Sequence, residues 1–321
     1  MNSHDNLTDQ ATQLGAHAEL RRSLGASPRR VPPRWLYDDR GSELFDQITR
    51  LPEYYQTEAE RQILATHSTM IAERTGATTV IELGSGTSDK TRTLLDAFVA
   101  HGTIECFTPL DVSAETLHAA AEMLRGRYAD LRVEPLVGDF NLDLNRLPAG
   151  GIRLVALLGG TIGNFYVEER SAFLGALQSV LDPGDWVLLG FDLIKPLDRL
   201  VAAYNDAQGV TDTFIRNALH AINRELDGNF DVGNFSYVPL WDGCEERIDM
   251  RLRANEPERV RIHRLDLDLV VEAGEELQIE ISAKFDPQRL IGELSESGFE
   301  DAEVFTDDAG DFGLLLARRS A

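Results

Sequence analysis

The chain has 321 residues, of which 43% are hydrophobic and 26% charged, a composition typical of a globular protein with one large domain or two. Its 54 acidic and 31 basic residues give a formal net charge of −23. A surface of this sign repels phosphate backbones and anionic headgroups, which argues against nucleic acids and membrane surfaces as partners.

Two cysteines, Cys106 and Cys244, stand far apart in the sequence, which fits a reducing compartment better than a disulfide framework. The first twenty residues lack the apolar centre of a signal peptide, and no apolar run reaches membrane-spanning length. The seven histidines are scattered singly, so no metal is expected. We therefore expect a cytoplasmic protein and, since no heptad or long apolar stripe is apparent, a monomer.

Helical patterns dominate the chain before residue 75. Ser42 and Thr57 are residue types that cap helix N-termini, and each precedes a run with apolar residues at helical spacing. The predicted helices cover 16–24, 42–50 and 58–74.

From Thr78 to Phe191 strands and helices alternate, which predicts a parallel sheet with right-handed crossovers. The predicted strands are 78–83, 105–110, 132–137, 153–158 and 185–191, and the predicted helices are 88–100, 114–127 and 167–181.

The pattern changes after Pro196. Two helices (197–206 and 211–225) precede three strands in which apolar and polar residues alternate, as in an antiparallel sheet with one wet face. Those strands are predicted at 245–254, 259–271 and 276–284, followed by a helix to about 297 and strands at 302–306 and 312–317. We expect an α/β fold with a doubly wound seven-stranded sheet and an inserted α+β domain. The predicted domains are 61–196 with 286–321, and 1–60 with 197–285.

A glycine-rich turn follows the first strand of the predicted sheet, and the helix after it offers unpaired N–H groups, as in nucleotide cofactor sites. Asp111 closes the second strand, where a carboxylate can accept ribose hydroxyls. Asp139 and Phe140 close the third, where they suit an adenine. The predicted cofactor residues are Gly84, Ser85, Gly86, Thr87, Lys90, Asp111, Val112, Asp139 and Phe140.

These residues also have simpler interpretations. Asp111 or Asp139 alone is equally consistent with a helix N-cap, and Lys90 with a solvated lysine. A dinucleotide motif would place a third glycine where Asp89 stands. The glycine turn and two acids at consecutive strand ends together resemble class I methyltransferases that use S-adenosylmethionine. In that interpretation Lys90 pairs with the carboxylate of the cofactor.

The fourth strand ends in a second glycine-rich turn, from Gly159 to Asn164. Such a turn admits a small substrate close to the backbone, and the Asn164 amide offers both a donor and an acceptor. The simpler interpretation is a tight turn in which Thr161 or Asn164 caps the next helix.

From about residue 30 onward the chain resembles the L-histidine Nα-methyltransferases of ergothioneine biosynthesis. The segments that carry the resemblance are 35–38, 41–46, 48–55, 82–88, 160–165 and 311–314. The resemblance implies three successive methylations of the α-amino group of histidine, which yield hercynine, with S-adenosylhomocysteine as the other product.

The resemblance also implies residue roles. Tyr37 and Glu280 would hold the imidazole ring, with Ser282 in support and Met250 nearby. Groups that bind the carboxylate and amino group of the substrate would be Asn164, Tyr204 and Tyr54, and the methyl-transfer zone would be lined by Phe45, Gly159 and Thr161. Asn164, Tyr37 and Glu280 are the catalytic candidates.

Three alternatives remain open at this point. A related enzyme could methylate another amino acid such as tryptophan or tyrosine, although a large apolar ring needs no carboxylate at position 280. A non-catalytic module could bind adenosylmethionine or a nucleotide. An NAD oxidoreductase shares the glycine turn and the ribose acid.

Overall fold

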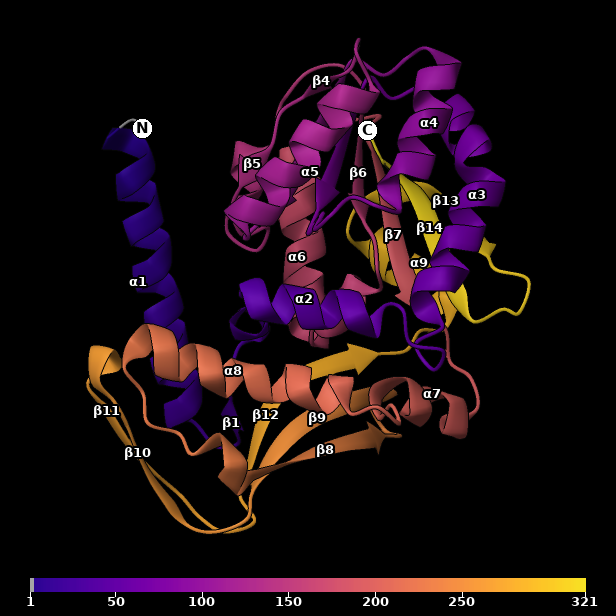
Figure 1. Cartoon of the computed structure of the whole chain (residues 1–321). Helices are drawn as coiled ribbons and strands as arrows, with labels where there is room; N and C mark the ends of the chain where they lie inside the picture. The colour runs from indigo at the N-terminus through magenta and orange to yellow at the C-terminus, as the bar shows by residue number, and fades with distance from the viewer. Residues whose placement is uncertain (1–2) are drawn as a thin grey trace. The chain divides into compact units, whose positions relative to one another are not determined.

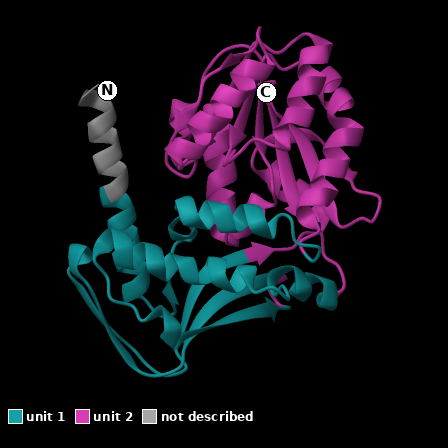
Figure 2. Cartoon of the chain, viewed as in Figure 1, with its two compact units in different colours: residues 1–53, 197–243, 248–281 teal, residues 54–196, 244–247, 282–321 magenta. Residues whose placement is uncertain are grey.

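The computed structural model describes residues 3–321, with side chains from residue 14 onward. The chain divides into two compact units (Figure 2). The α/β unit comprises residues 54–196, 244–247 and 282–321, and the α+β unit comprises residues 1–53, 197–243 and 248–281. Residues 54–60 and 282–285, which the predicted domains place with the inserted segment, belong to the α/β unit.

A mostly parallel sheet forms the centre of the α/β unit (Figure 1). The strands are β2 (Thr79–Leu83), β3 (Cys106–Asp111), β4 (Arg132–Val133), β5 (Leu136–Val137), β6 (Arg153–Leu157), β7 (Trp186–Asp192), β13 (Phe299–Thr306) and β14 (Phe312–Arg319). Their order is β13-β14-β7-β6-β2-β3-β4, with β5 also paired to β3. Strand β14 runs antiparallel to both neighbours. The chain leaves β2 toward β3 on one side and returns to β6 on the other, so the carboxyl ends of β2 and β6 form the switch point where such sheets bind ligands.

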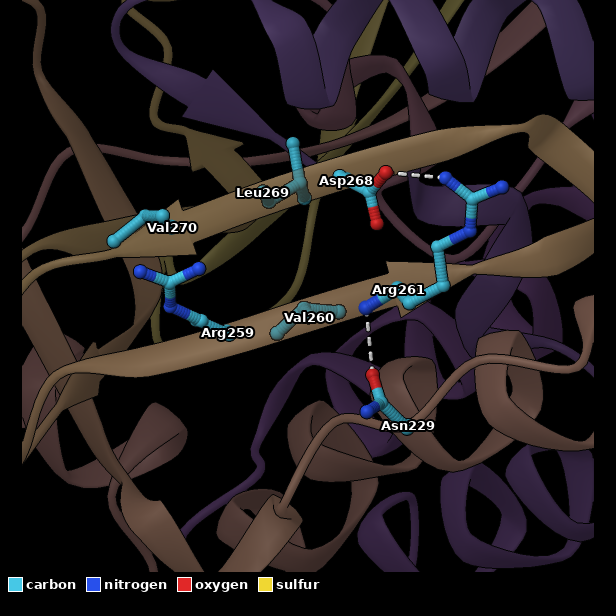
Figure 3. A pocket seen from close by; sticks show the side chains of 7 residues that line it. All are labelled: Asn229, Arg259, Val260, Arg261, Asp268, Leu269 and Val270. Carbon is cyan, nitrogen blue, oxygen red and sulfur yellow. Dashed lines mark hydrogen bonds and ion pairs between the residues drawn. The ribbon is translucent and has the colours of Figure 1, made fainter.

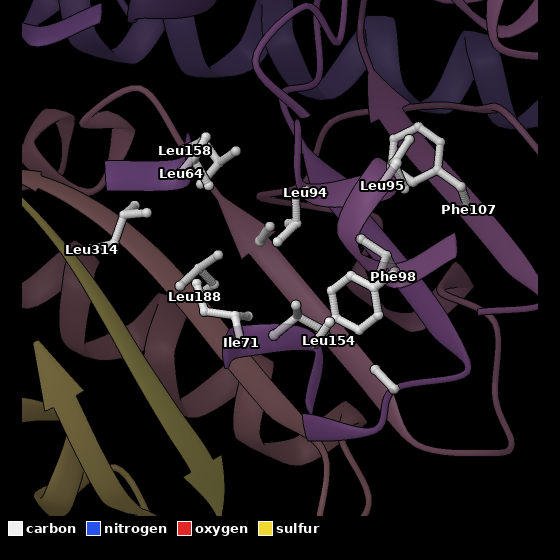
Figure 4. Packing of buried hydrophobic residues seen from close by; sticks show 14 of the residues in the cluster. Leu64, Ile71, Leu94, Leu95, Phe98, Phe107, Leu154, Leu158, Leu188 and Leu314 are labelled. Carbon is white, nitrogen blue, oxygen red and sulfur yellow. The ribbon is translucent and has the colours of Figure 1, made fainter. Parts of the chain in front are cut away.

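Helices cover both faces of this sheet. Strands β2, β6 and β7 are therefore buried along their whole length, which explains their nearly continuous apolar sequences. The helices of the unit are α3 (Gln56–Thr75), α4 (Thr91–His101), α5 (Ala114–Arg127), α6 (Val167–Val180) and α9 (Pro287–Glu296), with 3-10 turns η2 (Leu144–Arg146) and η3 (Thr161–Asn164). Side chains of α3, α4 and α5 pack on one face, and those of α6 and α9 on the other. Figure 4 shows the packing of α3 and α4 side chains on the first face.

The α+β unit contains a four-stranded sheet of order β1-β12-β9-β8 and a separate antiparallel ribbon of β10 and β11. The strands are β1 (Arg29–Arg30), β8 (Phe235–Asp242), β9 (Arg247–Ala254), β10 (Glu258–Ile262), β11 (Leu267–Val271) and β12 (Glu276–Ala283). The helical segments are α1 (Ser3–Gly25), η1 (Pro33–Leu36), α2 (Asp39–Ile48), α7 (Leu197–Tyr204), α8 (Val210–Leu226), η4 (Val232–Asn234) and η5 (His263–Leu265). None of the helices described over residues 3–321 is long and apolar enough to cross a membrane.

Both predicted helix caps are wrong. Helix α2 begins at Asp39, and its cap is Asp38, whose carboxylate accepts the Gly41 N–H at 2.7 Å. A carboxylate also interacts favourably with the helix dipole, which explains why the cap lies at the acid. Thr57 lies inside α3, which begins at Gln56 without a side-chain cap.

Three strand predictions also need correction. The strand predicted over 259–271 is a ribbon of two strands, because Asp266 turns the chain at φ 46°. The strand predicted over 132–137 is divided into β4 and β5 around Pro135, which has no N–H for a ladder. Strand β8 was not predicted, and Pro239 within it is a residue that argues against a strand.

Candidate active site

The first glycine-rich turn joins β2 to α4. Gly84 and Gly86 have φ values of 68° and 49°, the left-handed region that glycine adopts without strain. The Gly84 N–H donates to the Leu110 carbonyl at 2.8 Å, and a Cβ added to Gly86 would meet no atom within 4 Å. Gly84 is exposed and open space lies beside Gly86, so the turn leaves room for a ligand at the switch point.

Asp111 ties this turn to the end of β3. Its Oδ2 accepts the Gly86 N–H at 2.8 Å and its Oδ1 accepts the Ser113 N–H at 2.9 Å. Ionised carboxylates have about four acceptor positions, so the half-buried Asp111 can accept further hydrogen bonds. Val112 beside it is 43% exposed.

Phe140, a predicted adenine contact, lies beside the glycine-rich turn after β2. Its ring lies 3.5 Å from the position of a Cβ on Gly84 and packs edge-on against Phe165 and Phe173. Asp139 is buried, and its Oδ1 accepts the backbone and side-chain N–H groups of Asn141, each at 2.9 Å. The predicted cofactor residues of three strand ends therefore converge within one unit.

Lys90 has a partner that sequence reasoning did not find. Its ammonium pairs with Glu60 of α3, and both carboxylate oxygens of Glu60 also accept the Gly159 N–H, at 2.8 and 3.0 Å. The only sequence signal for Glu60 is its place among the apolar positions of α3, next to Ala59 and three residues before Ile63.

The second glycine-rich turn follows β6. Gly159 and Gly160 both have a φ of 76°, and the Thr161 hydroxyl donates to the Leu158 carbonyl at 2.8 Å. Asn164 closes η3 and is half-buried. Tyr54, just before α3, is buried.

In the α+β unit, Tyr37 and Glu280 meet. The Tyr37 hydroxyl donates to Glu280 Oε1 at 3.3 Å. The Tyr37 ring packs edge-on against Phe45 and Phe214, with centroid distances of 5.8 and 5.5 Å. Two residues predicted to hold one ring are therefore in contact, and Phe214 of α8 is an aromatic neighbour that the prediction omitted.

Burial controls the chemistry of Glu280. Desolvation raises its pKa to about 8, and the hydrogen bond from Tyr37 offsets only part of this effect. The carboxyl is therefore mostly protonated at pH 7. Met250 of the neighbouring strand β9 is also buried.

Tyr204 lies beside Tyr237, a residue of the unpredicted strand β8. The Tyr237 hydroxyl donates to the Tyr204 carbonyl at 2.7 Å. Burial raises the pKa of Tyr237 well above its ordinary value, and the charges of Tyr204 and Glu280 add to this shift. Tyr237 is therefore a further polar group near Tyr204 and Glu280.

Ser282 faces a buried cluster that the sequence did not reveal. Its Oγ accepts a hydrogen bond from Lys284 at 2.7 Å, and Lys284 pairs with Asp192 at 2.8 Å. Asp192 also pairs with Lys195 and accepts the Tyr55 hydroxyl at 2.9 Å.

A pocket lies on the β10–β11 ribbon, where the Arg261 guanidinium pairs with Asp268 and the Arg261 N–H donates to Asn229 at 2.7 Å (Figure 3). Its lining residues are Asn229, Arg259, Val260, Arg261, Asp268, Leu269 and Val270. It contains none of the predicted site residues.

The strand order, the glycine turn at the end of β2 and the acids after β3 and β5 define a class I methyltransferase that uses S-adenosylmethionine. Residues 16–319 match the family described as "Histidine-specific methyltransferase, SAM-dependent", and the chain belongs to this family.

Relatives of the chain include bacterial and fungal proteins. The histidine N-alpha-methyltransferase of Mycobacterium tuberculosis is 47% identical over 98% of each chain. The protein of the same name from Mycolicibacterium smegmatis is 48% identical over 94% of each chain. Ergothioneine biosynthesis protein 1 of Neurospora crassa is 31% identical over 91% of this chain and 33% of its own length.

Proposed function

We propose that this protein transfers three methyl groups from S-adenosylmethionine to the α-amino group of L-histidine and so forms hercynine, a step of ergothioneine biosynthesis. The observation that carries the proposal is Glu280, a buried carboxyl that accepts a hydrogen bond from Tyr37 beside the Phe45 and Phe214 rings. An imidazole has ring nitrogens that can donate to such a carboxyl or accept from it. The side chain of an apolar amino acid could form no hydrogen bond with this carboxyl.

The cofactor residues of the proposal all belong to the α/β unit. Gly84, Ser85, Gly86 and Thr87 form the turn that contacts the cofactor, Asp111 suits ribose hydroxyls, and Asp139 and Phe140 suit an adenine, with Val112 and Lys90 completing the set. When bound, S-adenosylmethionine supplies an electrophilic methyl group on its sulfonium.

We assign the amino-acid end of the substrate to Asn164, Tyr204 and Tyr54, and the lining of the methyl-transfer zone to Phe45, Gly159 and Thr161, with Met250 and Ser282 supporting the imidazole. An α-ammonium has a pKa of about 8 or above, so it must lose a proton before each attack, and we assign that proton to water. Alignment and exclusion of water by these residues then provide most of the catalysis.

The test is to incubate the purified protein with S-adenosylmethionine and each of the twenty amino acids in turn, and to follow products by mass spectrometry. A gain of three methyl groups on histidine alone is the expected result. Methylation of another amino acid would overturn the role of Glu280 and keep the cofactor assignment. Cofactor binding without methylation of any amino acid would contradict the enzymatic proposal.

We further propose that residues 61–196 with 286–321 form the cofactor-binding domain, that residues 1–60 with 197–285 form the substrate-binding domain, and that the protein acts as a cytoplasmic monomer. The low cysteine count supports the location. Light scattering coupled to size-exclusion chromatography tests the monomer, for which a mass near 35.6 kDa is expected.

A further inference from the structure

Glu60 is a fully buried acid in the middle of the α/β unit. Its side chain has no solvent exposure, whereas the Lys90 side chain that pairs with it is 21% exposed. Acidic side chains are almost never fully buried without a partner. Lys90 therefore has one side toward Glu60 and another toward solvent, and the carboxylate lies behind the lysine.

Glu60 connects the two glycine-rich turns of the switch point. Lys90 follows the turn after β2, and Gly159 begins the turn after β6. Both oxygens of Glu60 accept the Gly159 N–H, and one of them also pairs with Lys90. A Cβ placed on Gly159 would lie 3.5 Å from the Lys90 ammonium nitrogen, so the three groups converge at one point.

The sheet provides space for this carboxylate at Gly190 of β7. A Cβ on Gly190 would collide with Glu60 Oε1 and would lie 3.3 Å from the Gly159 nitrogen. Because a strand interior ordinarily disfavours glycine, a glycine there marks the close approach of another group. The Glu60 headgroup therefore occupies a place that any larger residue at position 190 would fill.

The neighbouring acid Glu82 does not replace Glu60 as the charge partner of Lys90. Burial raises the pKa of Glu82 to about 8, so it is mostly neutral at pH 7, and it accepts hydrogen bonds from the Ser88 and Thr91 hydroxyls. Glu60 is thus the carboxylate that holds the ammonium in place.

We propose that Glu60 is a positioning residue for methyl transfer, which fixes Lys90 and the Gly159 turn in one arrangement from behind. The inference rests on the proposed function for the roles of those two groups, Lys90 toward the cofactor carboxylate and Gly159 beside the transferred methyl. Loss of the Glu60 charge releases the lysine, and loss of one acceptor oxygen weakens the hold on the turn, since the Gly159 N–H then has one acceptor in place of two.

The test compares Glu60→Gln with the wild-type protein. Glutamine keeps the size of the side chain but has no charge and only one acceptor oxygen, so the ion pair with Lys90 is lost and the Gly159 N–H keeps at most one of its two contacts. We expect the dissociation constant of S-adenosylmethionine, measured by calorimetry, to rise about tenfold and kcat to fall about tenfold, since hydrogen bonds to charged groups have effects of this size. Glu60→Asp keeps the charge and should recover part of the affinity.

Glu58→Gln is the matched control, because Glu58 lies on the same helix, is 77% exposed and pairs with Arg61. It should leave both quantities within twofold of wild type. A purely structural role for Glu60 would lower the unfolding temperature and leave the affinity and kcat of the folded enzyme unchanged, and this result would overturn the proposal.

A double-mutant cycle with Lys90→Met tests the route of the effect. If Glu60 acts through Lys90, Glu60→Gln should change cofactor affinity less than twofold in the Lys90→Met background. If the double variant instead weakened cofactor binding by the product of the two single-variant effects, Glu60 would act independently of Lys90, and the proposal would be overturned. Calorimetry needs no histidine, so a wild-type protein that binds the cofactor without methylating histidine would contradict the proposed function and leave the affinity result decisive for Glu60.

Discussion

Glu280 of the α+β unit and Glu60 of the α/β unit are both buried carboxyls, and they differ in the groups that face them. Glu280 accepts a hydrogen bond from a tyrosine hydroxyl, and burial raises its pKa to about 8. Glu60 faces an ammonium group and a backbone N–H that both donate to it. The Glu280 carboxyl is therefore mostly protonated at pH 7, whereas the Glu60 carboxylate forms an ion pair with Lys90.

This difference separates two uses of a buried acid. A neutral carboxyl can donate a hydrogen bond as well as accept one, which suits a ligand whose ring nitrogens change protonation. A paired carboxylate holds fixed donors in place, and it makes their positions depend on one another. We therefore expect substitutions at the two glutamates to affect different properties of the enzyme.

The largest effect is expected for Lys90→Met. Removal of the ammonium leaves the Glu60 carboxylate buried without its charge partner, and breaking such a pair costs about 3 kcal/mol of the free energy of unfolding. Urea denaturation at pH 7 measures this loss.

The double variant Glu60→Gln/Lys90→Met removes both charges and should recover most of that free energy. A double variant as unstable as Lys90→Met alone would show that the lost lysine contacts, and no stranded charge, cause the destabilisation.

The next effect is expected for Glu280→Ala, which should lower kcat/KM for histidine about 100-fold, the size expected when a buried polar group of the ligand is left without its hydrogen-bond partner. The cofactor affinity should stay within twofold, because the cofactor residues of the proposal belong to the other unit. Steady-state kinetics and calorimetry provide the two measurements.

Glu276→Ala is the control for this variant. Glu276 lies on the same strand and forms ion pairs with Arg251 and Arg253, so its loss should change kcat/KM less than twofold. Unchanged histidine turnover in Glu280→Ala would refute the imidazole assignment.

Much of the sheet could be predicted from the sequence, because β2, β3, β6 and β7 are nearly continuous apolar runs that end in glycines or acids. Details that depend on single residues could not. The cap of α2 is Asp38 and not the predicted Ser42. Strand β8 contains a proline, which is tolerated because β8 lies at the edge of its sheet.

The candidate site shows the same limit. Residues at strand ends, such as Asp111 and Asp139, could be found because the carboxyl ends of parallel strands share one edge of a sheet. Glu60 could not be found, since it is 30 residues from Lys90 and 99 from Gly159 in sequence. Its place among the apolar positions of α3 indicates burial and identifies neither partner.

The pH dependence of stability also sharpens the comparison. Burial holds the pKa of Glu280 at about 8 in the folded chain, whereas an exposed glutamate has a pKa of about 4.5. Below pH 4.5 both states are protonated and there is no penalty. As pH rises from 4.5 to 8, only the unfolded chain ionises, so the folded state loses about 1.4 kcal/mol per pH unit from this group.

Glu280→Gln should therefore remove this slope, and its stability relative to wild type should rise between pH 5 and pH 7. Glu82→Gln should do the same in the α/β unit, where burial also raises the pKa to about 8. Urea denaturation at pH 5, 6 and 7 measures the slopes. Parallel curves for Glu280→Gln and wild type would contradict the protonated state of Glu280.

The smallest effect is expected for Tyr37→Phe, which removes one hydroxyl and keeps the ring that packs against Phe45 and Phe214. Since Glu280 is mostly neutral at pH 7, the lost hydrogen bond is an ordinary one of about 1 kcal/mol, and kcat/KM for histidine should fall about fivefold. The Tyr37 hydroxyl lowers the pKa of Glu280, so its removal should raise that pKa and extend the upper end of the stability slope to higher pH. A loss as large as that of Glu280→Ala would instead mean that Glu280 is ionised and that Tyr37 stabilises its charge, which would erase the contrast with Glu60.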